Sequence, residues 1–352
     1  MQNPNSSRTK RFAAVLGWAL LLMCLPQNAY SRSGTITSFD VPGATGGTFA
    51  QIVNEEGRIA GSYVDASGTH AFVRSERGVI TSFDPPGSSQ TYPKGMNEDG
   101  AITGSYYDVS GTAHGFLRDE HGKITTFDVQ GATYGTFPLS INDDNAITGF
   151  YNDASFTAHA FVRGEHGPIR TFDVQGATFG TFAQSINKSG AVAGSFGDAM
   201  GQHGFLRDPQ GVFATFDAPG TGTIEIPSTN VESLNDGGTI TGFYYPPSIY
   251  HGFARDPQGT ITMFDAPGSD YTLPMSINKG GSVAGSYWTP GFQAAHGFVR
   301  DPQGVITTFD PPSAAFTFAY SINSAGIIAG TYLGFDGFNH SFLGFVRTVA
   351  DE

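Results

Sequence analysis

Short apolar runs separated by glycine-containing turns recur along most of the chain. In one copy the runs cover residues 50–53, 58–63, 71–74 and 79–83. Each run has the length of a β-strand. The connecting turns Asn54-Glu55-Glu56-Gly57 and Ser75-Glu76-Arg77-Gly78 end in the residue type that accepts a positive φ in a hairpin. The pattern predicts two antiparallel hairpins, and hence a four-stranded sheet, in every copy.

Two independent markers, a Phe-Asp pair and an Asn, define the repeat. Each recurs seven times at intervals of 43 to 48 residues, a spacing typical of the blades of a β-propeller. The aspartates are Asp40, Asp84, Asp128, Asp173, Asp217, Asp265 and Asp310. The asparagines are Asn54, Asn97, Asn142, Asn187, Asn235, Asn278 and Asn323.

The two ends of the repeat region favour a ring over a linear array or a sandwich. The region begins with a lone strand, residues 35–39, and ends with three strands, residues 319–322, 327–332 and 343–347. The lone strand can complete the last sheet only in a ring, which also removes exposed strand edges. We predict an all-β, seven-bladed β-propeller of four-stranded antiparallel blades whose N-terminal strand completes the last blade. The small residues Ala60, Gly61 and Ser62 are expected where neighbouring sheets pack.

The N-terminus has the features of a secretory signal peptide. Three basic residues precede an apolar run, residues 12–25, and a small-residue site follows at Ala29-Tyr30-Ser31. We expect a signal peptide at 1–31 and a propeller domain at 32–352, with the protein secreted, periplasmic or at the cell surface. An uncleaved anchor and a lipidated Cys24 are the alternatives. The run is short for a membrane span, and Met23 stands where a lipidation signal has a small residue.

The net charge restricts the classes of partner that the chain can bind, and the cysteine content excludes a disulfide. Without residues 1–31 the chain keeps 15 basic and 31 acidic residues, a net charge of −16. Nucleic acid and anionic lipid would be repelled, whereas cations, neutral sugars and basic proteins would not. Cys24 is the only cysteine, so the cleaved chain holds no disulfide. We expect a monomer without a membrane span.

A His-Ala-Phe or His-Gly-Phe string opens the third run of most copies. Its histidines are His70, His114, His159, His203, His251 and His296. The string resembles the bacterial HAF repeats, a family of extracellular repeat proteins, and the resemblance covers all seven copies. It implies an extracytoplasmic repeat protein and brings no defined activity or catalytic residues. The seventh copy is expected to depart from the pattern, with Leu343 in place of the histidine and His340 three residues earlier.

The repeated histidines and aspartates suggest a metal site, since imidazole is a common ligand. One His per blade would lie too far from the next for a single ion, unless all pointed into the channel. We favour a structural His bonded to backbone or a nearby carboxylate, and predict no metal and no cofactor. For the Phe-Asp aspartates we favour pairing with a periodic arginine over a loop cap or a cation ring. These arginines are Arg74, Arg118, Arg163, Arg207, Arg255, Arg300 and Arg347.

Acidic residues outside the Phe-Asp motif receive simpler interpretations. Asp65, Asp108, Asp153 and Asp198 head the loops between the second and third runs, where bonding within the loop is favoured over calcium. Glu225 and Glu232 remain after the repeat consensus is subtracted, and are expected to lie in the insertion of the fifth copy. We interpret them as solvated loop charges, although two carboxylates could also act as acid and base.

The long connections of the repeat carry the residue types expected of a binding surface. No nucleophile elbow, phosphate loop or zinc-protease motif occurs in the sequence. Function tends to reside on variable loops, and the variable connections here carry aromatic residues. The candidate binding residues are Tyr134, Phe179, Tyr245, Tyr271, Trp288 and Phe316.

The function these features favour is that of a non-catalytic binding or scaffold protein for a carbohydrate, peptide or protein. A propeller hydrolase or lyase acting on a polysaccharide and a purely structural envelope protein are the alternatives. The aromatic residues could instead cap the blade contacts.

Overall fold

The computed structural model describes residues 34–165, 167–219, 228–245 and 249–345, within the compact unit Ser31–Glu352. The expected signal peptide, Glu225 and Arg347 lie outside the described residues. The described part of the chain forms 28 strands and one short 3-10 helix, η1 (Pro290–Phe292). None of its helices is long and apolar enough to cross a membrane.

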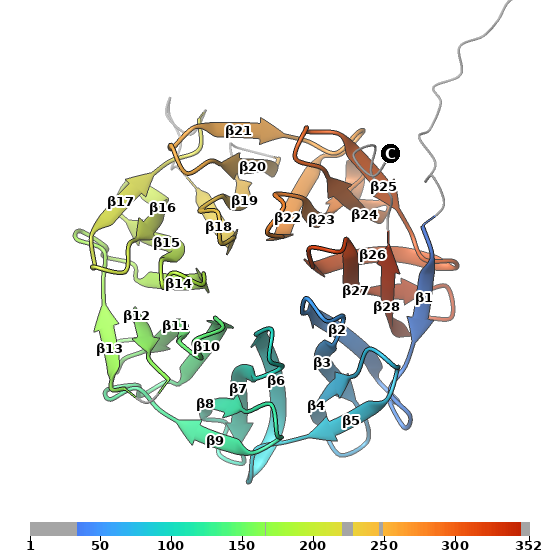
Figure 1. Cartoon of the computed structure of the whole chain (residues 1–352), viewed down its shortest axis with the longest axis horizontal. Coiled ribbons are helices and arrows are strands. Elements are labelled where there is room, and N and C mark those ends of the chain that lie inside the picture. Colours follow the sequence, from blue (N-terminus) through green and yellow to red (C-terminus); the bar gives the residue numbers. More distant parts are fainter. Residues whose placement is uncertain (1–33, 166, 220–227, 246–248, 346–352) are drawn as a thin grey trace, which may run out of the picture. The chain divides into compact units, whose positions relative to one another are not determined.

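The strands pair in antiparallel sets of four that are arranged in a circle (Figure 1), which confirms the predicted four-stranded sheets. We call the strands of a set inner, second, third and outer. We call the space between the inner strands the central channel, and residues of every set line a cavity at one of its ends. The inner strands are β2 (Gly47–Val53), β6 (Ser88–Met96), β10 (Thr136–Ile141), β14 (Thr181–Ile186), β18 (Thr229–Leu234), β22 (Tyr271–Ile277) and β26 (Ala314–Ile322). The second strands are β3 (Ile59–Val64), β7 (Ile102–Asp108), β11 (Ile147–Asn152), β15 (Val192–Asp198), β19 (Ile240–Tyr244), β23 (Val283–Trp288) and β27 (Ile327–Gly334).

The third and outer strands complete each set. The third strands are β4 (Thr69–Arg74), β8 (Ala113–Arg118), β12 (Ala158–Arg163), β16 (Gly201–Arg207), β20 (His251–Arg255), β24 (Ala295–Arg300) and β28 (Asn339–Phe345). The outer strands are β5 (Ile80–Phe83), β9 (Ile124–Phe127), β13 (Ile169–Phe172), β17 (Phe213–Phe216), β21 (Ile261–Phe264), β25 (Ile306–Phe309) and β1 (Ile36–Phe39). β1 pairs with β28, so the N-terminal strand lies at the edge of the last set.

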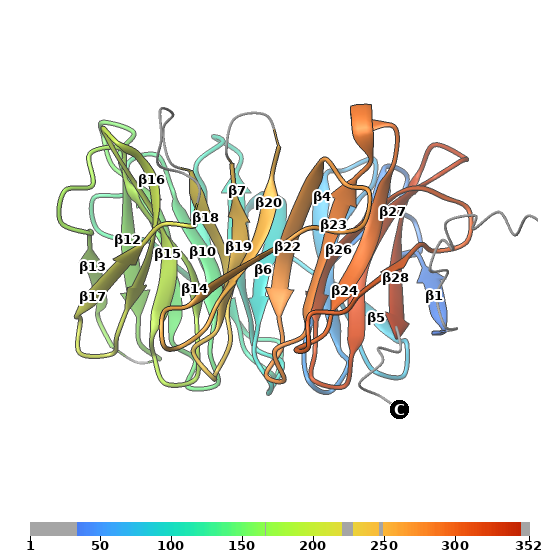
Figure 2. The same ribbon diagram turned by 90° about the horizontal axis from the view of Figure 1, so that it is seen from above.

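The connections divide the described unit into two faces, visible from the side in Figure 2. Turns between inner and second strands, and between third and outer strands, form the short-turn face. Loops between second and third strands, together with the crossings from each outer strand to the next inner strand, form the long-loop face.

Neighbouring sets are joined by the phenylalanine of the Phe-Asp pair. Phe127 at the end of β9, for example, meets the fully buried Phe161 of the next set edge-on, with 6.3 Å between ring centroids. The same edge-on contact occurs between all neighbouring sets at 5.9 to 6.3 Å. Such pairs contribute about 0.5–1.5 kcal/mol each beyond the area that they bury. The repeated Phe therefore stabilises the contact between sets.

Every inner strand carries a one-residue bulge, and this bulge explains the glycine of the second strand. In β10 the register shifts between Pro138 and Ser140, so that Leu139 is the extra residue. Opposite the bulge, a Cβ on Gly149 would lie 2.1 Å from the backbone oxygen of Phe137. The equivalent glycine of every set meets the same obstacle at 2.0 to 2.2 Å.

The expectation that the small residues of the second strand all serve packing between sheets was therefore partly wrong. Ala60 does pack against the next set. Gly61, in contrast, is required within its own sheet, because its Cβ would overlap the backbone of Phe49.

We predict that Gly149→Ala lowers the free energy of unfolding by about 1–3 kcal/mol, because the added methyl overlaps a carbonyl that the bulge holds in place. Gly167→Ala is the control, since no heavy atom lies within 4 Å of its Cβ position. Urea unfolding measures both variants. Equal midpoints would show that the inner strand moves away without cost.

Candidate functional site

The bulges of the inner strands define a ring of variable side chains, which we call the bulge ring. Its members are Gln51, Lys94, Leu139, Gln184, Glu232, Met275 and Tyr320. A bulge turns the extra side chain out of the regular alternation of the strand. Lys94 and Leu139 accordingly line a cavity beside the central channel. Since the backbone is the same in every set, the bulge ring varies without disturbing the fold.

Glu232 and Lys94 are the charged members of the bulge ring. Neither side chain has a hydrogen-bond or ion-pair partner among the described residues. Desolvation by the surrounding protein raises the pKa of the half-buried Glu232 to about 7 and lowers the pKa of Lys94, whose side chain is exposed to solvent. The interpretation of Glu232 as a solvated loop charge was therefore wrong, because it lies on β18 among protein atoms. Its position three residues before Asn235 in the repeat was the signal that sequence reasoning missed.

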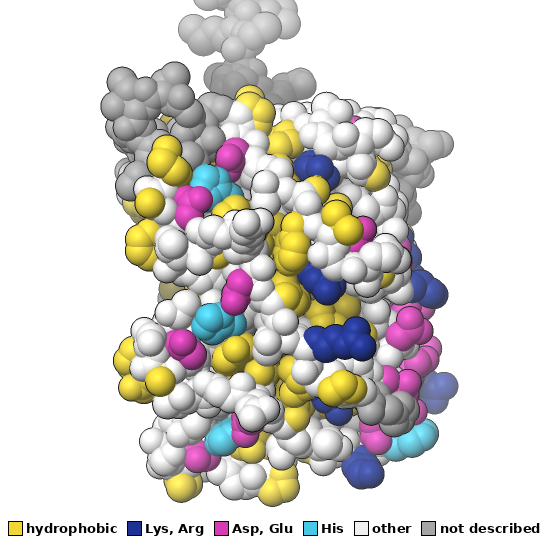
Figure 3. Space-filling view, turned by 90° about the vertical axis from the view of Figure 1, so that its left-hand side faces the viewer, with side chains coloured by type: hydrophobic (Ala, Val, Ile, Leu, Met, Phe, Trp, Pro, Cys, Tyr) yellow, Lys and Arg dark blue, Asp and Glu magenta, His cyan; other side chains and the backbone are white. Residues whose placement is uncertain are grey.

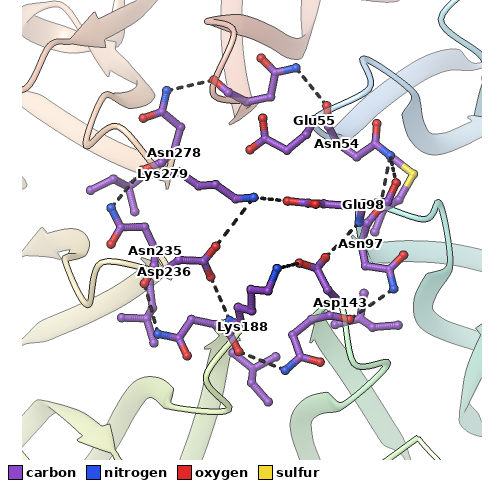
Figure 4. Close-up of a pocket in the computed structure, with 18 of the residues that line it drawn as sticks. Asn54, Glu55, Asn97, Glu98, Asp143, Lys188, Asn235, Asp236, Asn278 and Lys279 are labelled. Carbon is purple, nitrogen blue, oxygen red and sulfur yellow. Dashed lines mark hydrogen bonds and ion pairs between the residues drawn. The ribbon is translucent and has the colours of Figure 1, made fainter.

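The repeated asparagines close the channel wall at the short-turn face (Figure 4). The Asn142 amide donates to the backbone oxygen of Asn187 at 3.1 Å, and its Oδ1 accepts from the Ala146 amide at 2.9 Å. The same donation links each set to the next, and Asn323 completes the ring with a bond to Asn54 at 3.0 Å. We call these residues the asparagine ring.

Ion pairs cross the channel next to the asparagine ring. Lys279 pairs with Glu98 of a distant set and lies 3.9 Å from Asp236 (Figure 4). Lys188 and Asp143 lie 3.6 Å apart. The hydrogen bond that the Lys279 ammonium donates to the Glu98 carboxylate raises the pKa of Lys279 and keeps it charged. Charged side chains therefore bridge this mouth, around a cavity of about 170 Å³.

Exposed aromatic side chains occur only on the long-loop face, as far as the described residues go. These aromatic residues are Tyr134, Phe156, Phe179, Tyr245, Phe292, Phe335 and Phe338. Three of them are candidates from the sequence: Tyr134, Phe179 and Tyr245. The distribution gives the long-loop face rigid apolar contact area that the short-turn face lacks.

Four of the six candidate residues belong to one continuous aromatic cluster across the last three sets. We call it the aromatic arc, consisting of Tyr245, Tyr250, Tyr271, Phe292, Trp288, Phe316, Phe318 and Tyr320. Successive centroids lie 4.6 to 6.5 Å apart, with Trp288 contacting Phe292, Phe316 and Phe318. The arc runs from the exposed Tyr245 to Tyr320 of the bulge ring.

The remaining candidates, Tyr134 and Phe179, lie on other sets. Tyr134 stacks on Phe156 with centroids 3.6 Å apart, whereas Phe179 is 69% exposed. Phe156 escaped the sequence analysis although a signal was present. It replaces the glycine of the loop Asp108-Val109-Ser110-Gly111 in the related loop Asp153-Ala154-Ser155-Phe156.

Phe156 and Phe292 both have a left-handed backbone conformation, with φ of 61° and 57°. Bulky residues rarely adopt this region, and doing so costs about 1–2 kcal/mol. Each ring nevertheless stacks on a tyrosine, Phe156 on Tyr134 of the preceding crossing and Phe292 on Tyr271 at the start of β22. Such strain in an exposed loop is typical of residues kept for contact with a ligand rather than for stability.

The repeated histidines bond to the Phe-Asp aspartates on the outer wall near the long-loop face. His159 Nδ1 lies 2.8 Å from Asp173, and the same pairing occurs in every set at 2.6 to 2.9 Å. Histidine and acidic side chains accordingly recur together along one margin of the wall in Figure 3. The predicted structural role through a nearby carboxylate is thus supported by geometry.

Two predictions about these motifs were wrong. The aspartate pairs with the histidine rather than with the periodic arginine, whose guanidinium lies 4.8 to 5.0 Å from a Phe-Asp ring of the preceding set. The seventh copy does not depart from the pattern either. His340 pairs with Asp40 and faces Tyr332 in the register of His70 and Tyr63, and Leu343 lies further along β28.

Five of the histidines approach a second carboxylate, from the loop between second and third strands. His159 Nε2, for example, lies 3.5 Å from Asp153. Burial alone would lower the pKa of His159, but Asp173 and Asp153 together raise it. The five histidines with raised pKa are His70, His114, His159, His203 and His340.

The loop aspartates mainly organise their own loops, as predicted. Asp153 accepts from the amides of Ser155 and Thr157 at 2.8 and 3.0 Å, and these bonds lower its pKa. In Asp108 the Ser110 hydroxyl is the largest cause, and the pKa falls to about 2. Within the described ranges, no group of three or more His, Cys, Asp and Glu side chains is placed to hold a metal ion.

Comparison with known proteins identifies the fold but not the family. The sequence matches no family model and no curated protein. Virginiamycin B lyase from Staphylococcus aureus, as a catalytically inactive variant with quinupristin, superposes with a TM-score of 0.60 at 12% identity, covering 89% of this chain and all of that one.

Two further solved structures show the same fold. The β-propeller domain of the Trilobed protease from Pyrococcus furiosus gives a TM-score of 0.58 at 8% identity, covering 87% of this chain and 99% of that one. Puromycin hydrolase gives 0.58 at 12% identity, covering 84% of this chain and 52% of that one. At these identities the likeness shows a β-propeller and no shared activity.

The pKa shifts predict a pH dependence of stability. The raised histidine pKa values contribute stability below the ordinary value of 6.5, which is lost as the pH rises through the raised values. The lowered aspartate pKa values contribute stability above 3.8, which is lost as the pH falls through the lowered values. The histidine–aspartate pairs therefore stabilise the fold most between pH 3.8 and pH 6.5.

We expect His159→Gln to reduce the unfolding midpoint more at pH 5.5 than at pH 8, measured by thermal unfolding in matched buffers. His121→Gln is the control, because the His121 side chain is 85% exposed. A loss of the same size at both pH values would show that the charged form of His159 contributes nothing.

Replacement of Phe156 separates strain from stacking. Phe156→Gly removes the ring and the left-handed strain together, whereas Phe156→Ala removes the ring alone. We expect the Gly variant to be more stable than the Ala variant by about 1 kcal/mol. Chemical unfolding of the two proteins tests this, and an Ala variant as stable as the Gly variant would contradict it.

Proposed function

We propose that the chain is an exported, non-catalytic binding protein that holds a carbohydrate on the long-loop face of a closed, seven-bladed β-propeller. The basic and apolar N-terminal segment and the resemblance to HAF repeats support export. N-terminal sequencing of the protein recovered outside the cytoplasm tests cleavage after Ser31.

Closure into seven blades is supported by two independent sets of bonds. The asparagine ring links each set to the next, and its last bond joins Asn323 to Asn54, 269 residues apart. At the outer wall, His340 of β28 bonds to Asp40 beside β1 at 2.8 Å. A closed ring gives the loops of its face fixed positions, which a preformed binding site requires.

The aromatic arc is the observation that carries the binding proposal. It breaks the repeat symmetry, it is continuous over three sets, and its Tyr245 and Phe292 are 38% and 55% exposed. Flat rings with little rotamer entropy suit the apolar faces of sugar rings, and the hydroxyls of tyrosines supply hydrogen bonds at their margins. The acidic net charge does not oppose a neutral sugar.

A second candidate, a polysaccharide hydrolase or lyase, is favoured by one specific observation. Glu232 is an unpaired carboxyl with a pKa of about 7, a value suited to proton transfer near neutral pH. If the purified protein releases products from neutral oligosaccharides and Glu232→Gln abolishes that release, the enzyme would be favoured over the binding protein.

The test is a panel of neutral oligosaccharides titrated calorimetrically against the purified protein. We expect Trp288→Ala and Tyr245→Ala to weaken binding by about 1–2 kcal/mol, or roughly 5- to 30-fold, because each ring loses its stacking contact. Val109→Ala is the control, since Val109 is a 92% exposed, non-aromatic residue of the same face.

Thermal unfolding of each variant accompanies the titrations. Binding that survives both aromatic substitutions would contradict the proposed site. Binding of peptides or a protein in place of the sugars would move the proposal to another ligand class. Aromatic variants that unfold without altered affinity would show that the arc only caps the contacts between sets.

A further inference from the structure

A second feature of the channel lies on the side away from the aromatic arc. Between the sets of β6 and β10 is a cavity of about 390 Å³, within the range of small-molecule sites. Its walls are the rings of Tyr92, Tyr107, Phe137 and Phe150. None of these residues belongs to the aromatic arc.

The four rings are arranged as two pairs. Phe137 and Phe150 stack with centroids 5.0 Å apart and planes 22° apart. Tyr92 and Tyr107 meet edge-on at 6.0 Å, and the Tyr92 hydroxyl donates to Gln90 at 2.6 Å. The cavity thus combines flat apolar walls with hydroxyl and amide groups, a combination suited to a sugar ring.

Lys94 supplies the charge of this cavity. It is the bulge residue of β6, and its ammonium has no ion pair or hydrogen bond among the described residues. Partial desolvation by the surrounding protein lowers its pKa, while the side chain stays exposed to solvent and so remains accessible to a ligand. The other described members of the bulge ring are neutral apart from Glu232, which contributes nothing to the Lys94 pKa. An accessible cation without a protein partner, placed beside aromatic walls, suits an anionic ligand.

We propose that this cavity binds the terminal hexuronate of an oligosaccharide, with the carboxylate on the Lys94 ammonium and the sugar ring against the aromatic walls. The proposal rests on the carbohydrate function proposed above and names the sugar class. A single carboxylate is specified because the acidic chain as a whole would repel a polyanion.

At the bulge position, the set of β6 differs from those of β2 and β14 by the positive charge of Lys94. The same bulge position holds glutamine in β2 and β14, so Lys94→Gln reproduces a residue that the fold already accepts there. Lys123→Gln removes an equal charge from an exposed turn on the short-turn face and serves as the matched control.

The experiment compares methyl β-D-glucuronide with methyl β-D-glucoside, which differ only in the carboxylate. Titration calorimetry should give at least tenfold tighter binding of the glucuronide. Lys94→Gln should abolish this preference without changing the melting temperature, and Lys123→Gln should leave it intact.

Three results would overturn the inference: equal affinity for the two glycosides, a preference that survives Lys94→Gln, or Lys94-dependent binding of benzoate without binding of the glucuronide. The outcome is separable from that of the proposed function. If neutral oligosaccharides bind in a Trp288-dependent manner and the glucuronide is not preferred over the glucoside, only the uronate site is rejected. A Lys94-dependent preference unaffected by Trp288→Ala would support the uronate site while rejecting the aromatic arc.

Discussion

One side-chain hydrogen bond, repeated from set to set, governs the geometry of this protein. Each repeated asparagine donates its amide to the backbone of the next set and accepts, through Oδ1, the amide four residues later. The first bond fixes the spacing of neighbouring inner strands and the second fixes the turn that follows each of them. Both groups are buried, so losing either would leave a polar atom unsatisfied. The channel, the bulges above it and the loops at the far end all take their positions from this arrangement.

The same constraint explains where variation is allowed. The buried Phe of the third strand, the Gly opposite the bulge and the asparagine all meet backbone or core atoms in every set. The bulge ring and the long loops do not, since their side chains leave the regular pairing. A lysine, a glutamate and a tyrosine can therefore occupy equivalent places without strain on the sheet. The chemistry of the protein is concentrated at positions that the ring leaves free.

Much of this could be predicted from the sequence because the repeat makes each local inference testable seven times over. The strand order within a set and the structural role of the histidines followed from turn residues and periodicity. The partner of the Phe-Asp aspartate was also within reach. Ala71 pairs with Phe83 in the hairpin of β4 and β5. His70 and Asp84 are therefore the next residues that face each other, whereas Arg74 faces Ile80 at the other end. Register, rather than charge alone, should have decided between the two partners.

Other features depend on contacts between sets, which no single copy reveals. The stacking of arginine on a phenylalanine of the preceding set is one example, and the aromatic arc is another. Tyr250 and Phe292 link the predicted Tyr245, Tyr271 and Trp288. Both linking residues lie outside the strands' regular repeat, and only the arrangement of neighbouring sets brings them next to the predicted residues. The bulge was hidden for a different reason. Every copy carries the bulge at the same place, so the extra residue does not show as a difference in repeat length. The inner strand therefore looked like a simple alternating strand in the sequence.

The bond between His340 and Asp40 has a consequence for how the chain reaches its native state. It joins residues 300 positions apart, so all of the chain between them must be available before it can form. Contacts of such long sequence separation incur a large loop-closure entropy and slow the rate-limiting step of folding. Until then the last sheet presents an open edge to other chains. A newly made molecule therefore passes through a stage in which nearly every sheet can form but self-association competes with completion, and protection during that interval decides its yield.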